Sequence, residues 1–177
     1  MLFRSLLSSL DDIAWLFNIR GADILHSPVV LAHALVKAGE AVLYVDESKL
    51  DDEIRVSLND EGIQTAPYDS IDGALAALKC GTTILIDDRR VSALLRQAIP
   101  KGCTVVCERE LTALPKARKN EVELTNWRRV QELDGAAVVR FWRWLEENVS
   151  SGNVTECSAA DRLEAVRRAC QIGRAHV

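Results

Sequence analysis

Short apolar runs alternate with helix-like segments between residues 28 and 108. Two β-rich runs, PVVLAHALV and EAVLYVD, flank the residues KAG, and this arrangement predicts a β-hairpin. Three later runs, IQTAPYD, TTILIDD and CTVVCE, predict further strands, and Pro67 places the first of them at a sheet edge or a strand end. Apolar residues at helical spacing predict helices within 48–62, 70–81 and 90–102. The alternation predicts an α/β fold with a mixed β-sheet flanked by helices, because a hairpin gives antiparallel neighbours and crossovers give parallel ones.

The pattern changes near residue 118, where we place a domain boundary. From Asn120 to residue 149, apolar residues recur at steps of three or four, which predicts one long helix capped by Asn120 and Glu123. We expect close packing at Gly135, since a glycine weakens a helix by about 1 kcal/mol relative to alanine. Ser158 and Asp161 are the expected cap pair of a second helix.

The stretch DDIAWLFNIRG precedes the first predicted strand, and its apolar run ends on an arginine. It predicts a short helix that packs Ile13, Trp15 and Leu16 against the sheet, followed by the turn IRG. Gly21 is expected to supply backbone freedom in this turn. An arginine at residue 20 is unusual beside such an apolar run.

Composition and charge exclude several classes of protein. The chain has 177 residues, 48% hydrophobic and 27% charged, which fits a globular domain plus part of another. A net charge of -4 argues against a general nucleic-acid or anionic-lipid binder. No apolar run reaches the ~18 residues of a membrane span, and the N-terminus lacks a signal core. We therefore expect a soluble, cytoplasmic protein that binds neither nucleic acid nor membrane.

Five cysteines without a CxxC pair predict reduced thiols. Cys103 and Cys107 lie in one predicted strand, where their sulfur atoms would stand roughly 13 Å apart at ~3.3 Å per residue. One metal ion cannot bridge that distance, so we interpret both as buried structural thiols.

The polar residues form no catalytic set and no metal site. His26 and His33 would lie on opposite faces of a single strand, and no further ligand has a matching spacing. Asp87 and Asp88 follow a buried strand, where ligands of α/β sheets often bind, but capping the next helix or facing water is the favoured interpretation. In RFWRWLEE, Phe141, Trp144 and Leu145 share a helix face, which favours packing and a cation–π contact over stacking on bases.

Several motifs together resemble one family. DDIAWLFNIRGADI is similar to the start of the second domain of three-domain aminopeptidase P, the cytosolic Xaa-Pro aminopeptidases, whose pattern is near D-E-I-A-W-L-L-N-I-R-G-S-D-I. VLYVDESKL resembles the same domain. KNEVEL, DGAAVVRFWRWLEE and TECSAADRLEAVRR resemble the first two helices of the pita-bread metallopeptidase domain. The resemblance covers about residues 11–171.

The resemblance implies a division of the chain into three parts. Residues 1–118 correspond to a creatinase-N-like α/β domain, and residues 119–171 to the opening helices of a truncated pita-bread catalytic domain. Residues 172–177, IGRAHV, resemble the translation of a sequencing-adapter read and are left out of the fold expectations. His176 is therefore not counted as a ligand.

The resemblance also implies an activity. The family removes the N-terminal residue from peptides with proline second, and two divalent metal ions, commonly manganese, activate a bridging water. Its ligands are two aspartates, a histidine and two glutamates, all downstream of the segment seen here. The fragment alone is therefore expected to contain no catalytic or metal-binding residue and to be inactive, while the complete enzyme is expected to be a homodimer.

One motif departs from the family. Where the family has G-M-R-x-A-H-I-R-D-G, this chain has NWRRVQELDG, in which Asp134 and Gly135 match. The departure keeps a rival open, namely a non-catalytic binding or dimerisation module that has lost the metal site. Another pita-bread branch, such as creatine hydrolysis, is a second rival, which AWLFNIRG disfavours.

Arg20 is the only candidate site residue, and two interpretations of it stay open. It could face the metallopeptidase cleft and contact peptide or a partner subunit. Alternatively, it could form a surface ion pair with one of three nearby aspartates, namely Asp11, Asp12 or Asp23.

Overall fold

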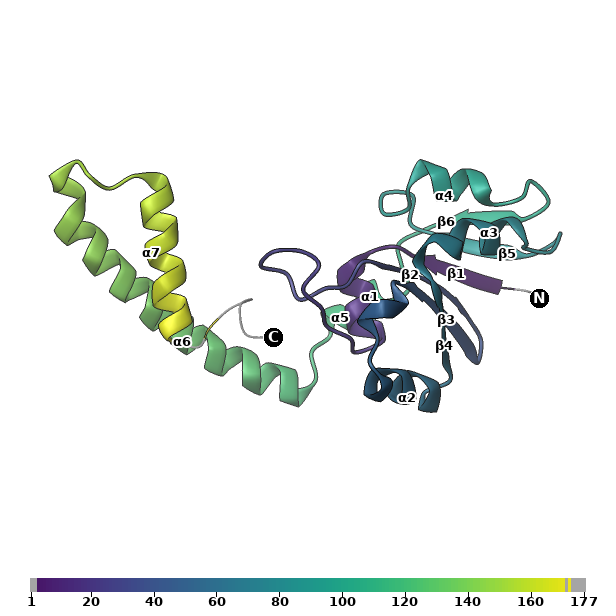
Figure 1. Ribbon diagram of the computed structural model, residues 1–177, viewed down its shortest axis with the longest axis horizontal. Helices are drawn as coiled ribbons and strands as arrows, with labels where there is room; N and C mark the ends of the chain where they lie inside the picture. Colours follow the sequence, from purple (N-terminus) through teal and green to yellow (C-terminus); the bar gives the residue numbers. More distant parts are fainter. Residues whose placement is uncertain (1–2, 171, 173–177) are drawn as a thin grey trace. The chain divides into compact units, whose positions relative to one another are not determined.

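The computed structural model describes residues 3–170 and residue 172, and it divides into two compact units between Arg118 and Lys119 (Figure 1). The first unit is an α/β structure and the second is a pair of helices. None of the described helices has the length and apolar character needed to cross a membrane.

A six-stranded mixed sheet forms the first unit, in the order β4-β3-β2-β1-β5-β6. Pairs β1–β2 and β2–β3 are antiparallel, whereas β3–β4, β1–β5 and β5–β6 are parallel. The predicted hairpin, the mixed sheet and the edge position of the strand that ends at Pro67 are confirmed. The strands are β1 (Phe3–Leu7), β2 (Ala32–Lys37), β3 (Glu40–Val45), β4 (Ile63–Pro67), β5 (Thr83–Ile86) and β6 (Thr104–Cys107).

Strand β1 lies in the middle of the sheet and was not predicted. Ser5, Leu6 and Leu7 are all buried, so this strand has no alternation of apolar and polar residues. Leu6 and Leu7 point into different core clusters, one on each face of the sheet. A central strand that is covered on both faces lacks the period-two pattern by which a half-buried strand is recognised.

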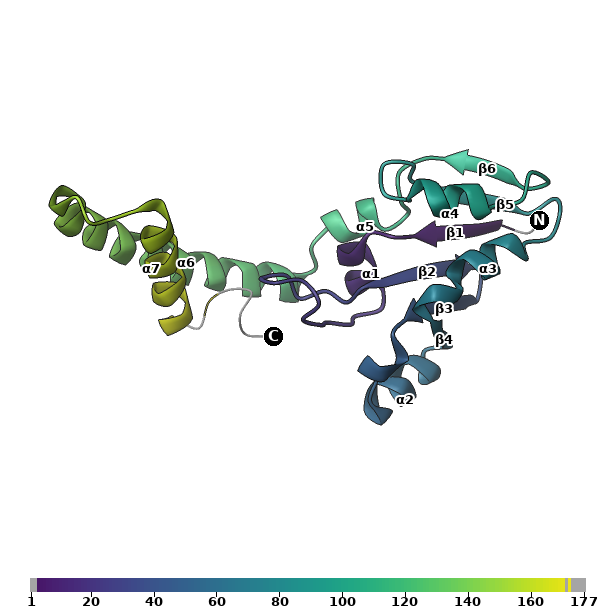
Figure 2. The ribbon, with the colours of Figure 1, turned by 45° about the horizontal axis from the view of Figure 1, so that its top comes forward.

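Each face of the sheet is covered by its own helices, as Figures 1 and 2 show. Helices α3 (Ile71–Ala76) and α4 (Ala93–Ala98) pack in the cluster that contains Leu6. Helices α1 (Leu10–Leu16) and α2 (Asp52–Asp60) pack in the cluster that contains Leu7. The short helix α5 (Ala113–Ala117) ends the first unit.

Helix α1 turns a different face to the sheet from the one predicted. Ile13 and Phe17 are buried, Trp15 is half-buried and Leu16 is 39% exposed. Ile13 and Phe17 are four residues apart and so share one helix face, whereas Leu16 falls outside that face. The prediction for Leu16 was therefore wrong.

The second unit consists of α6 (Glu121–Asn148) and α7 (Glu156–Ala169). The capping box of Asn120 and Glu123 is confirmed, because each side chain accepts the backbone N–H of the other at 2.9 Å. Helix α7 begins earlier than predicted, with Thr155 as its cap and Ser158 as the reciprocal partner. The prediction of Ser158 and Asp161 as the cap pair was wrong, because the extended backbone at Thr155 lets its hydroxyl accept the Ser158 N–H at 3.1 Å.

Polar and aromatic contacts join the two helices of this unit. Arg167 donates to both carboxylate oxygens of Asp134, at 2.7 and 3.1 Å. The Arg162 guanidinium lies 5.5 Å from the ring centre of Trp144, so the predicted cation–π contact is present, with its cation on α7. The expectation at Gly135 was wrong, since a β-carbon there would meet no atom within 4 Å among the described residues other than the helix's own nearby backbone.

Several large apolar side chains of α6 are exposed in this unit. They are Val122, Trp127, Val130, Leu133, Val139 and Trp142. All but one of the residues 172–177, the predicted foreign tail, lie outside the described part of the chain; Ile172 donates its N–H to the Arg167 carbonyl at 3.0 Å.

The cysteines at the two ends of β6 are less buried than predicted. Cys107, its last residue, is exposed, and Cys103, which directly precedes the strand, is half-buried. The interpretation as buried thiols was wrong because β6 is an edge strand of the sheet.

Candidate functional site

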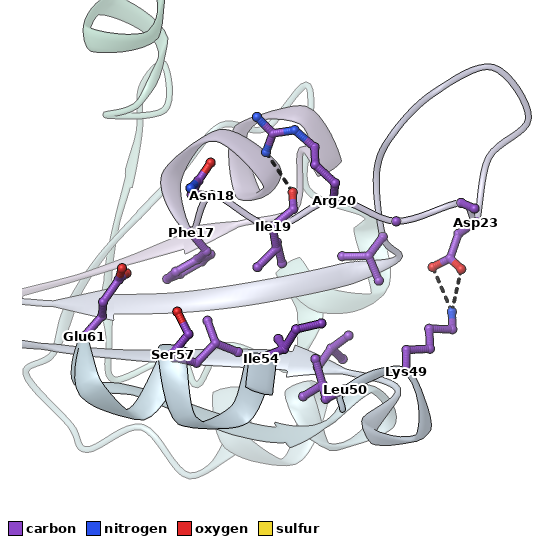
Figure 3. A pocket seen from close by; sticks show the side chains of 15 residues that line it. Phe17, Asn18, Ile19, Arg20, Asp23, Lys49, Leu50, Ile54, Ser57 and Glu61 are labelled. Carbon is purple, nitrogen blue, oxygen red and sulfur yellow. Dashed lines mark hydrogen bonds and ion pairs between the residues drawn. The ribbon is translucent and has the colours of Figure 1, made fainter. Parts of the chain in front are cut away.

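A cavity of about 450 Å³ lies between the loop that follows α1 and the inner face of α2. Figure 3 shows the side chains that line it. They come from three parts of the fold, namely residues 17–23 after α1, Val30 before β2 with Val45 of β3, and the segment from η1 (Glu47–Lys49) through α2. The cavity therefore depends on segments that are distant in sequence.

The floor of the cavity is apolar. Phe17, Val45 and Leu58 are buried there, and each belongs to the core cluster beneath α1 and α2. Ile19 and Ile54 are partly buried beside them. This floor could accept an aliphatic or aromatic side chain.

The loop that carries Arg20 is fixed by the end of α1. Asn18 adopts a left-handed conformation, with φ of 50°, and the Ile19 N–H donates to the Ala14 carbonyl at 3.2 Å. These two features form a Schellman cap, in which asparagine can replace the usual glycine. Arg20 adds to this cap, because its Nη1 donates to the carbonyl oxygens of Ala14 at 2.7 Å and Ile19 at 2.9 Å. The guanidinium thus neutralises the negative end of the helix and ends the apolar run on a charge.

An ion pair stands at one end of the same cavity. Lys49 Nζ lies 2.8 Å from both carboxylate oxygens of Asp23, as Figure 3 shows. Asp23 also accepts the Leu31 N–H at 2.7 Å. These hydrogen bonds hold the pKa of Asp23 below its usual value, and the bond from Lys49 has the largest effect. The pair links the loop after α1 to η1.

The sequence prediction of an ion pair for Arg20 was wrong. Among the described residues, the three nearby aspartates pair with lysines instead: Asp23 with Lys49, and Asp11 and Asp12 with Lys116. The Arg20 side chain is exposed and is directed away from the apolar floor in Figure 3. The other interpretation, a contact with peptide or a partner subunit, stays a prediction.

Gly21 has a different role from the one expected. A β-carbon at this position would lie 3.2 Å from both the Val29 carbonyl oxygen and the Val30 β-carbon. The residue therefore allows the loop to lie close to the strand, whereas a left-handed backbone is found at Asn18.

The remaining candidates lie apart from this cavity. His26 is exposed in a loop, whereas His33 is half-buried in β2, where its Nδ1 lies 3.0 Å from the Ser8 hydroxyl. Burial lowers the pKa of His33.

Asp87 is buried, and its carboxylate accepts two hydrogen bonds from the Arg89 side chain, at 2.7 and 2.9 Å. These bonds bring the pKa of Asp87 down to about 2, although burial opposes the shift. The helix that follows is capped by Ser92, so the capping alternative was wrong for both aspartates, whereas Asp88 is exposed and faces water as the other alternative predicted.

A buried carboxyl pair, Asp12 and Glu110, was missed by the sequence analysis. Glu110 is 4% exposed, and neither of its carboxyl oxygens has a well-aligned donor among the described residues. Burial, with the Asp12 carboxyl beside it, raises the pKa of Glu110 to about 7. The pKa of Asp12 is lowered, because Lys116 at 2.8 Å outweighs the opposing effect of burial. The pair lines a second cavity of about 430 Å³, and no local pattern marks Glu110 as buried.

Neither cavity is lined by a metal-ligand cluster among the described residues. The described residues contain no set of three histidine, cysteine, aspartate or glutamate side chains placed to hold a metal ion. The residues around the first cavity offer an apolar floor and charged groups at its rim, and these can bind a side chain or a peptide segment.

Known proteins resemble this chain in sequence and in fold. Residues 4–123 match the Creatinase/Prolidase N-terminal domain family. A probable Xaa-Pro aminopeptidase P of Laccaria bicolor is 39% identical over 165 residues, which cover 89% of this chain and 25% of the relative. A probable Xaa-Pro aminopeptidase P of Botryotinia fuckeliana is 37% identical over 171 residues, 92% of this chain and 26% of the relative.

A solved structure shares the fold. The X-prolyl aminopeptidase of Caenorhabditis elegans, described as a cytosolic enzyme with a di-nuclear active site, superposes with a TM-score of 0.79 at 27% identity. The match covers 93% of this chain and 28% of the nematode enzyme. This chain spans about a quarter of the length of the curated relatives it matches. It belongs to the creatinase/prolidase N-terminal domain family and is homologous to a segment of the Xaa-Pro aminopeptidases P.

Proposed function

We propose that this chain is a segment of a metal-dependent aminopeptidase that releases the N-terminal residue from peptides with proline in second position. The observation that supports this most is the 37–39% identity to probable Xaa-Pro aminopeptidases P across about nine-tenths of the chain. In this proposal, residues 1–118 form the creatinase-N-like domain, and residues 119–171 open the catalytic domain.

The metal ions belong to a part of the protein outside this segment. The di-nuclear site of the nematode enzyme supports two divalent ions, for which we propose manganese. The described residues do not fit such a site, because they provide no ligand set for even one ion. In this proposal the five ligands lie downstream of this segment, and the 177-residue chain is inactive by itself. The complete enzyme is a cytoplasmic homodimer.

The exposed apolar side chains of α6 support a truncated catalytic domain. Trp127 and Trp142 of this helix are 54% and 64% exposed. Exposed apolar surface of this kind normally packs against another element. The remainder of the catalytic domain is the element we assign to it.

The proposal is tested with the protein encoded by the complete source transcript, read beyond the codon for Gln171. We expect this protein to cleave Xaa-Pro peptides only with divalent metal. Removal of metal with a chelator should abolish turnover, manganese should restore it, and the 177-residue chain should show none.

Two outcomes would overturn the enzyme proposal. A complete protein that binds no metal and cleaves no peptide would favour the rival, a non-catalytic binding or dimerisation module. The atypical NWRRVQEL motif is the feature that keeps this rival in consideration. A complete protein that hydrolyses creatine and not peptide would favour the other pita-bread branch.

Arg20 has a proposed role toward the substrate or the partner subunit. Its Nη1 caps α1, while the rest of its exposed guanidinium remains near the cavity rim. In the complete enzyme, Arg20→Ala should lower kcat/KM by about tenfold, the effect of one lost hydrogen bond to a charged group. Arg20→Lys should retain the positive charge but lose the planar guanidinium, which can donate two parallel hydrogen bonds.

A purely structural role for Arg20 gives a different result. The loss of the α1 cap would lower the free energy of unfolding by about 1 kcal/mol in both the complete enzyme and the 177-residue chain. Unchanged peptide turnover together with this loss of stability would rule out the substrate or partner role. Arg109→Ala, at an exposed arginine outside the first cavity, is the matched control.

A further inference from the structure

Two cysteines lie side by side at the start of the parallel strands β5 and β6. Cys80 is exposed in the turn before β5, and half-buried Cys103 directly precedes β6. Backbone hydrogen bonds hold the two segments together: the Gly81 N–H donates to the Gly102 carbonyl at 2.9 Å, and the Thr104 N–H donates to Thr82, also at 2.9 Å.

The two thiols are placed reciprocally. The Cys80 Sγ lies 3.6 Å from the carbonyl oxygen of Gly102, the residue before Cys103. The Cys103 Sγ lies 3.6 Å from the carbonyl oxygen of Lys79, the residue before Cys80. Each thiol therefore reaches the peptide group that leads into the other cysteine.

Gly102 allows this close approach. A β-carbon on Gly102 would lie 2.9 Å from the Cys80 Sγ and 3.6 Å from the Cys80 α-carbon. Any side chain at residue 102 would displace the thiol, so the glycine keeps the path between the two cysteines open. The other three cysteines show no such arrangement in the described part of the chain: among their thiols, only Cys170 has a hydrogen bond, from Arg140 at 3.3 Å.

We propose that Cys80 and Cys103 are a redox modification site and form a reversible disulfide. A thiol–disulfide oxidant such as glutathione disulfide drives the reaction. A thiolate of one cysteine attacks glutathione disulfide and releases one glutathione; the thiolate of the second then attacks the mixed disulfide and releases another. The two protons given up by the cysteine thiols pass through solvent to the two departing glutathione thiolates, so the two cysteines are oxidised and glutathione disulfide is reduced to two glutathione molecules.

The bond would reinforce one edge of the sheet. Strand β6 is an edge strand that pairs only with β5 among the described strands. The disulfide closes a loop of about 24 residues, and such a loop restricts the unfolded chain appreciably. The chain beyond β6 leads to Glu110 and α5, so the bond also anchors the segment that carries them.

The 177-residue protein, incubated with reduced or oxidised glutathione and then alkylated, provides the test. Trypsin places Cys80 in the peptide of residues 80–89, and both Cys103 and Cys107 in the peptide of residues 102–109. A Cys107→Ser background therefore makes the assignment unique. We expect a disulfide-linked pair of these peptides after oxidation, which dithiothreitol dissolves, and a rise in Tm of roughly 10 °C.

Matched variants distinguish the Cys80–Cys103 disulfide from oxidation at other cysteines. In the Cys107→Ser background, Cys80→Ser and Cys103→Ser should each abolish both the linked peptides and the rise in Tm, whereas Cys157→Ser should leave them intact. The proposal is overturned if oxidation yields only glutathione adducts. It is also overturned if the rise in Tm persists in Cys80→Ser or Cys103→Ser.

Discussion

Replacing Glu110 by glutamine is expected to raise the free energy of unfolding at pH 8 by about 3 kcal/mol. The pKa of Glu110 in the folded protein is about 7, compared with an ordinary value of 4.5. At pH 8 the wild-type carboxylate is therefore buried with its charge beside Asp12, and this is unfavourable. Glutamine carries no charge and can donate a hydrogen bond to Asp12 at every pH.

The direction of the pH dependence follows from proton binding. Because the pKa is raised on folding, the folded protein binds more protons than the unfolded chain between about pH 4.5 and about pH 7. The stability contributed by protonated Glu110 is present below pH 4.5 and is lost as the pH rises through about 7. Glu110→Gln should remove this loss.

Other groups titrate differently and do not obscure the comparison. The lowered pKa values of Asp12 and Asp87 give stability that is lost only in acid, below the window of Glu110. The pKa of His33 is lowered by burial, so its contribution rises with pH. The effect of His33 cancels when wild type and variant are compared at each pH.

Urea unfolding of wild type and Glu110→Gln from pH 5 to pH 8 measures this difference. Glu108→Gln, at an exposed glutamate two residues earlier, is the matched control and should unfold like the wild type at each pH. If the difference in free energy between Glu110→Gln and wild type does not change across this range, Glu110 does not titrate as proposed.

Leu6→Ala is expected to destabilise the protein by about 3 kcal/mol, within the usual range of 2–5 kcal/mol for such a truncation. Leu6 is 0% exposed and lies in the cluster formed with α3 and α4. It belongs to β1, a central strand that pairs antiparallel with β2 and parallel with β5. A cavity at this position cannot be filled by shifting one helix, because strands flank it on both sides.

Thermal or urea unfolding measures this effect, followed by a signal from the first unit. Leu25→Ala is the control, because Leu25 is 81% exposed and should change stability by less than about 0.5 kcal/mol. Equal stabilities for the two variants would mean that β1 is not part of the core.

The sequence by itself determined most of the local structure, since local periodicity and capping carry that information. The hairpin of β2 and β3 followed from two β-rich runs around KAG. The capping box of α6 followed from the spacing of Asn120 and Glu123. The order of several sequence motifs also indicated the family, and the family match and the similar proteins confirm it.

The tertiary structure decided the position of β1 and the assembly of the two cavities. The face that α1 turns to the sheet depends on which residues the sheet covers, so it buries Ile13 and Phe17 and leaves Leu16 exposed. The partners of Arg20 are backbone carbonyls of a helix end, which only the folded cap brings within reach.

The pKa of Glu110 is another property that the sequence could not predict. Its sequence neighbours do not distinguish it from exposed Glu108, and its high pKa arises from burial and from Asp12, which is distant along the chain. Sequence patterns report the contacts that repeat along one helix or strand. The environment of a buried charge depends on segments that meet only when the chain folds, and it is therefore fixed by the tertiary structure alone.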